Sequence, residues 1–525
     1  MVTIHLPASS GLDGVFLPPT VDDTLPLFFS FPSTRETIMG IVVYNTLTRR
    51  KEPLVPRIPG RIGIYVCGMT VYDHCHIGHA RVMVVFDTIV RFLRATGLDV
   101  TYVRNFTDID DKIIRRAEET GVTMAELTTR FITAFHEDMD ALGVARADIE
   151  PCATAHMKEM QTMIARLIDK GLAYVGEGDV YYAVDRFPGY GTLSGKTLAD
   201  LAAGSRVAVD DRKRNPLDFV LWKGAKPGEP QWDSPWGAGR PGWHIECSAM
   251  STCYLGETFD IHGGGLDLVF PHHENEIAQT EGVTGRSAVS YWLHNGFVNV
   301  VGDTGEREKM SKSLGNFLTI RDLLARYPGE VVRLFILNSH YRSPLDFSHD
   351  LLTAARAGIE RIYTALQAAQ NLLGSLPPIH AIEATRNATT HHATDPVGRF
   401  MAAMEDDFNT PQALAVLFDM VKELNRAVAA QDQPGTERIA SLIQDLGSVL
   451  GLALQNPTQW FQANDSAATG EPTPQEIEAA IAERKAARQA RNFARADQIR
   501  DDLARRGVTL LDAKDGTSWR RQHPA

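Results

Sequence analysis

The sequence predicts an α/β protein in which a parallel-sheet domain carries a small insertion and is followed by an α-helical bundle and a small C-terminal domain. Three observations lead to this prediction. Residues 63–112 have the patterns of a strand, a helix and a strand in turn. Residues 172–240 contain short strand-like pieces among many Gly and Pro, and after residue 316 apolar residues recur mainly at helical spacing.

The length and composition are typical of a multidomain globular protein. A chain of 525 residues is too long for a single hydrophobic core, and 44% of its residues are hydrophobic. No apolar run approaches a membrane span, so we expect no membrane association. The five cysteines are too scattered for a disulfide framework, which favours a reducing compartment, the cytoplasm. Residues 1–38 lack the basic start of a secretory signal and are expected to form a disordered extension.

The first strand-helix-strand pattern predicts a parallel βαβ unit of a Rossmann-like sheet. GIYVCGMT reads as the first strand, HIGHARVMVVFDTIVRFLRATG as the helix and LDVTYVRNFTDIDDK as the second strand. The sheet is expected to resume at 259–262 and 292–300. Ligands of such sheets bind at the carboxyl ends of the strands, where Cys67 and Thr107 fall.

The C-terminal region combines a linker with a basic segment. Residues 454–473 have the composition of a linker, and residues 476–507 predict one long helix. Residues 484–521 hold eleven Lys or Arg against five Asp or Glu, although the whole chain has a formal net charge of −12. A local basic surface of this kind is compatible with a phosphate-backbone partner, and a solvated helix face is the alternative reading.

Two motifs have the residues expected of a polyphosphate site. His76, Gly78 and His79 stand between a strand and a helix, where imidazoles and backbone N–H groups can meet phosphate. Lys309 and Lys312 lie on a Ser- and Gly-containing segment, KMSKSLGN, that can close over a triphosphate. Each motif is weak alone, and the two in this order across a parallel sheet are a strong signal.

Three further stretches contain the residue types that zinc prefers. Thiolates come from Cys67 and Cys247, and FPHHENEIAQ adds an imidazole and a carboxylate. His272 and Glu276 are four residues apart, so both can face one side of a helix. His273 and Cys253 are rival ligands. Because these stretches adjoin groups suited to nucleotides and amines, we expect the metal to lie in an active site.

These motifs together resemble the class I aminoacyl-tRNA synthetases, and within that class the cysteine-specific family. The resemblance extends over about residues 39–521 and includes YVCGMTVYDHCHIGHAR, GWHIECSAM, FDIHGGGLDLVFPHHENEIAQ, KMSKSLGNF and GTSWRR. It implies the following sites: zinc at Cys67, Cys247, His272 and Glu276; cysteine at Thr107, Trp243 and His262; catalysis by His76, His79, Lys309 and Lys312; and ATP, with Mg²⁺, at Gly78, Gly263, Gly264, Gly265, Asp267, Lys309 and Lys312.

The resemblance also implies a tRNA-reading tail and a set of domain boundaries. The anticodon positions of the family correspond to Arg488, Phe493, Asp497 and Asp512, where the family often has Trp in place of Phe493. The implied domains are the extension 1–38, a catalytic domain of 39–150 and 241–345, an insertion of 151–240, a helical tRNA-binding domain of 346–455 and an anticodon domain of 474–525. A monomer is expected.

The implied function is the activation of L-cysteine with ATP and its transfer to the terminal adenosine of tRNA(Cys). Two alternatives remain open. A cysteine:amino-sugar ligase of the mycothiol type would form the same adenylate but lacks the anticodon domain. A non-catalytic zinc-containing RNA-binding paralogue would be expected to lose part of the HIGH or KMSKS motif, and both are intact here.

Overall fold

The structure is a computed structural model that describes residues 40–198, 200, 212–301, 307–309, 318–379, 395–462, 472–513 and 516–521. The extension expected at residues 1–38 lies outside these ranges. Within them, no helix has the length and apolar content needed to cross a membrane.

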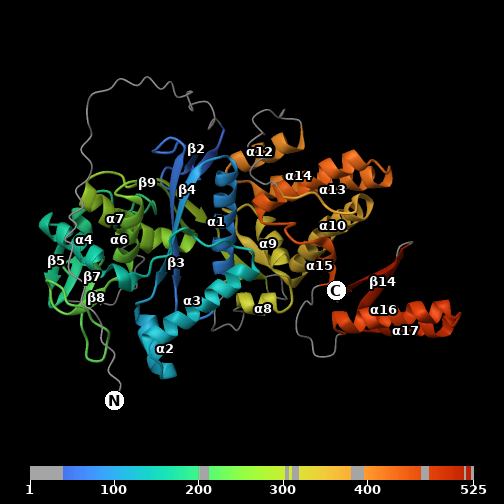
Figure 1. Cartoon of the computed structure of the whole chain (residues 1–525). Helices are drawn as coiled ribbons and strands as arrows, with labels where there is room; N and C mark the ends of the chain where they lie inside the picture. The colour runs from blue at the N-terminus through green and yellow to red at the C-terminus, as the bar shows by residue number, and fades with distance from the viewer. Residues whose placement is uncertain are drawn as a thin grey trace, which may run out of the picture.

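Four parallel strands form the central sheet, in the order β10-β9-β3-β4 (Figure 1). They are β3 (Arg61–Thr70), β4 (Asp99–Thr107), β9 (Phe259–Gly265) and β10 (Val289–Asn295). Helix α1 (Ile77–Ala95) connects β3 to β4, whereas β9 pairs with the other side of β3. The predicted Rossmann-like parallel sheet is therefore confirmed, and the strand order reverses between β3 and β9.

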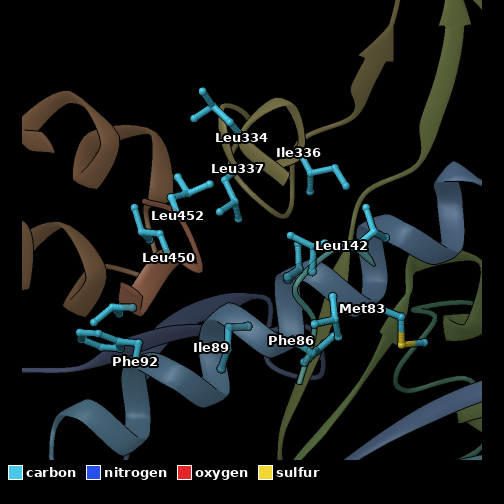
Figure 2. Close-up of a cluster of buried hydrophobic side chains, with 14 of the residues drawn as sticks. Met83, Phe86, Ile89, Phe92, Leu142, Leu334, Ile336, Leu337, Leu450 and Leu452 are labelled. Atoms are coloured by element: carbon cyan, nitrogen blue, oxygen red, sulfur yellow. The ribbon is translucent and has the colours of Figure 1, made fainter. Parts of the chain in front are cut away.

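Helix α1 joins the sheet to the helical region. Its apolar side chains recur at helical spacing, and Gly97, at φ 89°, follows its last turn. Figure 2 shows Met83, Phe86, Ile89 and Phe92 of α1 among leucines from other segments of the chain. Those leucines are Leu142, Leu334, Leu337, Leu450 and Leu452, all buried.

The single strand predicted at 292–300 is two strands in two sheets. β10 ends at Asn295, and β11 (Val298–Val301) pairs with β12 (Arg307–Lys309) and β13 (Leu345–Phe347). The break falls at Gly296, where a Cβ would lie 2.5 Å from the backbone oxygen of Ser343. This close approach of two backbones requires glycine and moves the chain into the second sheet.

An antiparallel sheet lies between β4 and β9 in the sequence and occupies one side of the molecule (Figure 1). It consists of β5 (Ala173–Gly176), β6 (Asp179–Tyr182), β7 (Phe219–Gly224) and β8 (Gly239–Pro241). Helix α4 (Met157–Asp169) packs against α6 (Trp243–Leu255) and α7 (Glu274–Thr284). Glu274 of α7 accepts backbone hydrogen bonds from Gly191 at 2.9 Å and Ser194 at 2.8 Å, which fixes the inserted segment to the ligand-bearing helix.

The hairpin of β1 (Val42–Asn45) and β2 (Arg50–Pro53) precedes the central sheet, and α2 (Asp111–Thr120) and α3 (Met124–Ala141) follow β4.

Helices make up most of the chain after residue 318. Up to residue 462 they are α8 (Ile320–Leu324), α9 (Gly329–Leu337), α10 (His349–Leu373), α12 (Pro396–Glu405), α13 (Thr410–Ala429), α14 (Gln433–Leu450) and α15 (Pro457–Gln462). Helix α10 packs against α9, α13 and α14.

The prediction of one helix over 476–507 is wrong. The segment forms α16 (Pro474–Gln489) and α17 (Phe493–Arg505), joined by a tight turn. Arg491 adopts φ 59°, and the side chain of Asn492 accepts the N–H of Arg495 at 3.2 Å to begin the second helix. An Asn cap can outweigh helical periodicity because it satisfies a backbone donor of the first turn. The hairpin β14 (Val508–Ala513) and β15 (Gly516–Arg521) completes this unit.

A buried ion pair links α1 to α9. Arg333 of α9 is fully buried and makes an ionic contact with Asp87 of α1, while its Nε donates to the backbone oxygen of Leu450 at 2.6 Å. Burial alone would raise the pKa of Asp87, but Arg333 and Arg91 hold this pKa below its usual value. The contact therefore connects the sheet domain with the helices.

We expect Arg333→Met to lower the free energy of unfolding by about 3 kcal/mol, the lower end for a broken buried pair, because it removes the fully buried partner of Asp87 and leaves this carboxylate with the partly exposed Arg91 as its remaining ionic partner. Urea denaturation would measure the change. Arg94→Met is the matched control, since Arg94 and Asp148 form an exposed pair of the kind that contributes about 0–1 kcal/mol. Equal losses in the two variants would contradict a special role for the buried pair.

Candidate active site

The carboxyl ends of the strands bring together residues from distant parts of the sequence. Val66 of β3 lies opposite Gly263 of β9, so Cys67 follows directly beside the glycine run. Thr107 is the last residue of β4, and α1 begins at Ile77 just after β3. Two of the strands flank the point where the strand order reverses, which is where ligands bind in such sheets.

The four expected metal ligands form one buried cluster. The Sγ atom of Cys67 lies 3.6 Å from Sγ of Cys247 and 3.4 Å from Oε1 of Glu276, and Nε2 of His272 lies 3.1 Å from the same oxygen. All four ligand atoms lie within 4.8 Å of one another. The residues come from β3, α6, the turn before α7 and α7 itself.

The spacing of these atoms fits a tetrahedral metal ion. Bonds of about 2.0–2.3 Å to a central ion place neighbouring ligand atoms roughly 3.3–3.8 Å apart. The three distances from the cluster fall at or near this range. Two sulfurs, one nitrogen and one oxygen also match the donors that a borderline-soft divalent ion accepts.

A second set of ligands overlaps the first. Cys67 and Glu276 are shared, and Nε2 atoms of His262 and His273 lie 3.4 and 3.3 Å from Sγ of Cys67. The rival His273 is therefore within reach of a metal at a neighbouring position. The other rival, Cys253, is exposed and belongs to neither set of the described residues.

Burial disfavours the charged forms of the cluster residues. It raises the pKa of the Cys67 thiol and of the Glu276 carboxyl well above their usual values, and it lowers the pKa of His272 well below its own. All three groups consequently favour their neutral forms. A dication reverses this preference for thiols and carboxyls, because it stabilises the anions directly.

Two of the three residues expected to bind the amino acid, Trp243 and His262, contact this cluster, and the third, Thr107, is bonded to the residue before Cys247. Trp243 is the first residue of α6, and its ring stacks on His272 with centroids 4.3 Å apart. His262 of β9 lies beside Cys67 and stacks on Trp292. The Oγ1 atom of Thr107 donates to Oε2 of Glu246 at 2.8 Å.

The HIGH motif forms the amino end of α1. His76 is the N-cap and accepts the N–H of Gly78 at 3.0 Å through Nδ1, while Nδ1 of His79 accepts the N–H of His76 at 3.2 Å. The two imidazole rings stack with centroids 3.8 Å apart. Burial, with a smaller contribution from His76, lowers the pKa of His79 to about 3. The two rings are thus held side by side at a helix terminus.

The KMSKS segment lies partly outside the described residues, including Lys312. Lys309 ends β12, whose backbone pairs with β11. Immediately after the segment, Leu318 accepts the N–H of Ile77 at 3.2 Å, and Ile320 donates to Cys75 at 2.8 Å. These bonds join the chain that follows KMSKS to the residues of the HIGH motif.

The glycines expected to leave room for ATP also have packing reasons to be glycine. A Cβ on Gly263 would lie 2.2 Å from the Phe86 ring of α1, and one on Gly264 would lie 2.9 Å from His273. Gly265 ends β9 beside Asp267, which is exposed. The run therefore lets β9 approach α1 closely at the same edge of the sheet.

The expected anticodon residues occupy one small unit. Phe493 and Asp497 are four residues apart on α17, and the Phe493 side chain is 61% exposed. The carboxylate of Asp512 in β14 accepts hydrogen bonds from Nη1 and Nη2 of Arg484, each at 2.7 Å. Nη1 of Arg488 donates to the same carboxylate at 3.4 Å. Hydrogen bonds from Arg484 hold the pKa of Asp512 below its usual value. Arg484 was not anticipated.

Sequence reasoning missed four polar residues of the active site. His244 and Glu246 stand within the quoted GWHIECSAM segment, three and one residues before Cys247. His294 of β10 contacts Nδ1 of His273 at 2.7 Å, and Asn105 accepts the N–H of Gly68 at 2.9 Å. His244, Glu246 and Asn105 had a local signal, because each stands within three residues of a predicted site residue.

Comparison with known proteins identifies the family. Residues 53–357 match the model described as the tRNA synthetases class I (C) catalytic domain, residues 399–455 the DALR domain, and residues 471–520 the Cysteinyl-tRNA ligase anticodon binding domain. The cysteine–tRNA ligase of Magnetococcus marinus is 64% identical over 93% of this chain and 99% of its own length. The chain belongs to the cysteine–tRNA ligase family.

Another member agrees with this assignment, and more distant solved structures share the fold. The cysteine–tRNA ligase of Thioalkalivibrio sulfidiphilus is 58% identical over 91% of this chain and 99% of its own length. Among solved structures, the methionyl-tRNA synthetase of Mycobacterium tuberculosis has a TM-score of 0.50 at 16% identity, covering 77% of this chain and 91% of that one. The LeuRS of Agrobacterium radiobacter K84 has a TM-score of 0.53 at 12% identity, covering 78% and 86%. These last two show the fold.

We expect Cys247→Ser in this cysteine–tRNA ligase family member to lose most of its bound metal, since a neutral hydroxyl replaces a thiolate. Metal analysis of the purified protein would measure the loss. Metal binding should also strengthen as pH rises, because burial keeps the Cys67 thiol protonated until the ion displaces its proton. Cys253→Ser, on the same helix, is the control and should retain its metal. Full metal content in Cys247→Ser would contradict the four-residue assignment.

Proposed function

We propose that the protein activates L-cysteine with ATP and transfers it to the terminal adenosine of tRNA(Cys), and that a zinc ion at Cys67, Cys247, His272 and Glu276 selects the amino acid. The observation that carries this proposal is the buried cluster beside the HIGH helix, at the reversal of strand order. The cluster offers ligands to a thiol-binding ion, and the start of the helix carries the two stacked imidazoles of His76 and His79 for the phosphates.

The first step needs positioning and charge stabilisation. The carboxylate of cysteine attacks the α-phosphorus of ATP, and pyrophosphate leaves with its Mg²⁺. His76 and His79, with Gly78 between them, present the helix terminus to the triphosphate, and Gly263, Gly264, Gly265 and Asp267 border the nucleotide. Lys309 and Lys312 balance the charge that develops on the leaving group. Because the segment after KMSKS is bonded to Cys75 and Ile77, the two phosphate motifs act from adjoining backbone.

Thr107, Trp243 and His262 hold the amino acid above the cluster. When bound there, zinc supplies a thiophilic centre that favours the thiolate of cysteine over the hydroxyl of serine. A pocket of apolar groups alone would discriminate two such similar side chains by about tenfold to a hundredfold. The proposed ligand set therefore accounts for selection in the first step without a second, hydrolytic site.

In the second step a ribose hydroxyl of the terminal adenosine attacks the mixed anhydride. We assign anticodon recognition to Arg488, Phe493, Asp497 and Asp512, with stacking on the exposed Phe493 ring. The match to an anticodon-binding domain favours tRNA over an amino sugar as the acceptor. The five free cysteines support a cytoplasmic location, and a monomer belongs to the same proposal.

Cysteine-dependent ATP–pyrophosphate exchange tests the first step, and charging tests the second. We expect exchange with cysteine but little with serine, followed by transfer to tRNA and none to an amino sugar. Exchange with an amino-sugar acceptor but no tRNA charging would support the amino-sugar ligase instead. A protein that binds tRNA without exchange would be the non-catalytic paralogue.

We expect Lys312→Ala to slow exchange by on the order of 10²–10³, because the substitution removes a cation that meets charge only in the transition state. Equilibrium binding of cysteine should change little, since the amino acid site lies at the metal cluster. Pre-steady-state formation of the adenylate separates the two quantities. Exchange at the parent rate would show that the segment is not catalytic.

Deletion from residue 473 onward should spare exchange and impair charging, because the proposed phosphate and metal residues all precede it. The deletion removes the basic surface, so the loss should appear mainly in the dependence on tRNA concentration. The parent should also show the steeper salt dependence of tRNA binding. Both reactions are measured on one preparation. Parallel loss of exchange and charging would mean that the tail is structural.

A further inference from the structure

Two imidazoles are hydrogen bonded to each other at the edge of the metal cluster. Nδ1 of His244 lies 2.9 Å from Nδ1 of His272, while Nε2 of His272 lies 3.1 Å from Glu276 on the other side of the ring. A neutral imidazole that binds a cation through Nε2 carries its hydrogen on Nδ1. His272 is then the donor in this pair, and His244 accepts with the lone pair of its own Nδ1.

The surroundings hold both rings in this arrangement. Trp243 stacks on His272 at an interplanar angle of 24°, and Phe219 meets His244 edge-on with centroids 5.7 Å apart. His244 and Cys247 are three residues apart in α6, so they lie on neighbouring positions of one helix face. The same helix therefore carries one proposed ligand and the hydrogen-bond acceptor for another.

We propose that His244 is a positioning residue that orients His272 toward the metal, and that it thereby favours the set containing Cys247 and His272 over the overlapping set containing His262 and His273. This inference rests on the proposed metal site. A hydrogen bond to the second nitrogen of a ligating histidine fixes its tautomer and ring direction, and loss of such a bond weakens metal binding about 10–100-fold. His244 has no place among the ligands themselves, since neither cluster includes it.

Two substitutions separate the hydrogen bond from the bulk of the side chain. His244→Leu removes the acceptor, whereas His244→Asn keeps an oxygen near the position of Nδ1. We expect zinc affinity, measured on the full chain by competition with a chelator, to fall about 10–100-fold in His244→Leu. His244→Asn should retain most of the parent affinity. Cys253→Ser, on the same helix and exposed, is the matched control and should bind zinc as the parent does.

Thermal unfolding of the metal-free proteins provides the second readout. His244→Leu and the parent should unfold at similar temperatures without zinc and differ only with zinc present, because the proposed role exists only when His272 is a ligand. Parent-like zinc affinity in His244→Leu would overturn the inference, and so would equal weakening in His244→Asn. A matching loss of stability in the metal-free form would also overturn it, since His244 would then be structural.

The zinc content of the parent and of Cys247→Ser distinguishes this failure from failure of the metal site. If the parent binds no zinc, the proposed metal site is wrong and the inference falls with it. If Cys247→Ser loses zinc while His244→Leu keeps it at parent affinity, only the role of His244 is wrong.

Discussion

The parallel pairing of β3 with β9 is the constraint on which the candidate site depends. It places Tyr65 opposite His262 and Val66 opposite Gly263, so that Cys67 ends beside residues almost two hundred positions later. From β3 the chain turns through α1 to β4 on one side, whereas β9 lies on the other. The connections diverge at this edge, which leaves the carboxyl ends of the strands open to a ligand and the start of α1 directed to the same place.

This edge contains an unusual concentration of buried ionisable groups. Thiols, imidazoles and carboxyls lie in contact, and burial shifts each toward its neutral form. Such a group of side chains is costly in an apolar interior unless a cation compensates the anions. The proposed metal would therefore stabilise the local fold as well as bind a thiol, and the ligand helices would owe part of their order to it.

The insertion supports the ligand-bearing helices α6 and α7, and the helical region supports α1. Asp111 of α2 makes ionic contacts with Lys223 and Arg240 of the insertion, and β8 leads directly into α6. Glu274 holds the inserted segment from the first turn of α7. Because α6 supplies Cys247 and α7 supplies Glu276, movement of the insertion would shift these ligands. The Arg333–Asp87 contact anchors α1 from the opposite side.

Local patterns in the sequence were enough to predict the strand-helix-strand unit and the residue types of the buried cluster, since each depends on spacing within a few residues. Long-range packing decided the rest. Strand pairing and the turn before α7 bring both His272 and His273 close to Cys67. Gly296 divided a predicted strand because another backbone approaches it, and Asn492 divided a predicted helix by capping its second half. Arg484 and Asp512 are 28 residues apart in the sequence, and the packing of the β14–β15 hairpin on α17 brings them together. Periodicity reports which face of an element is apolar, whereas only the tertiary structure determines which distant side chains meet.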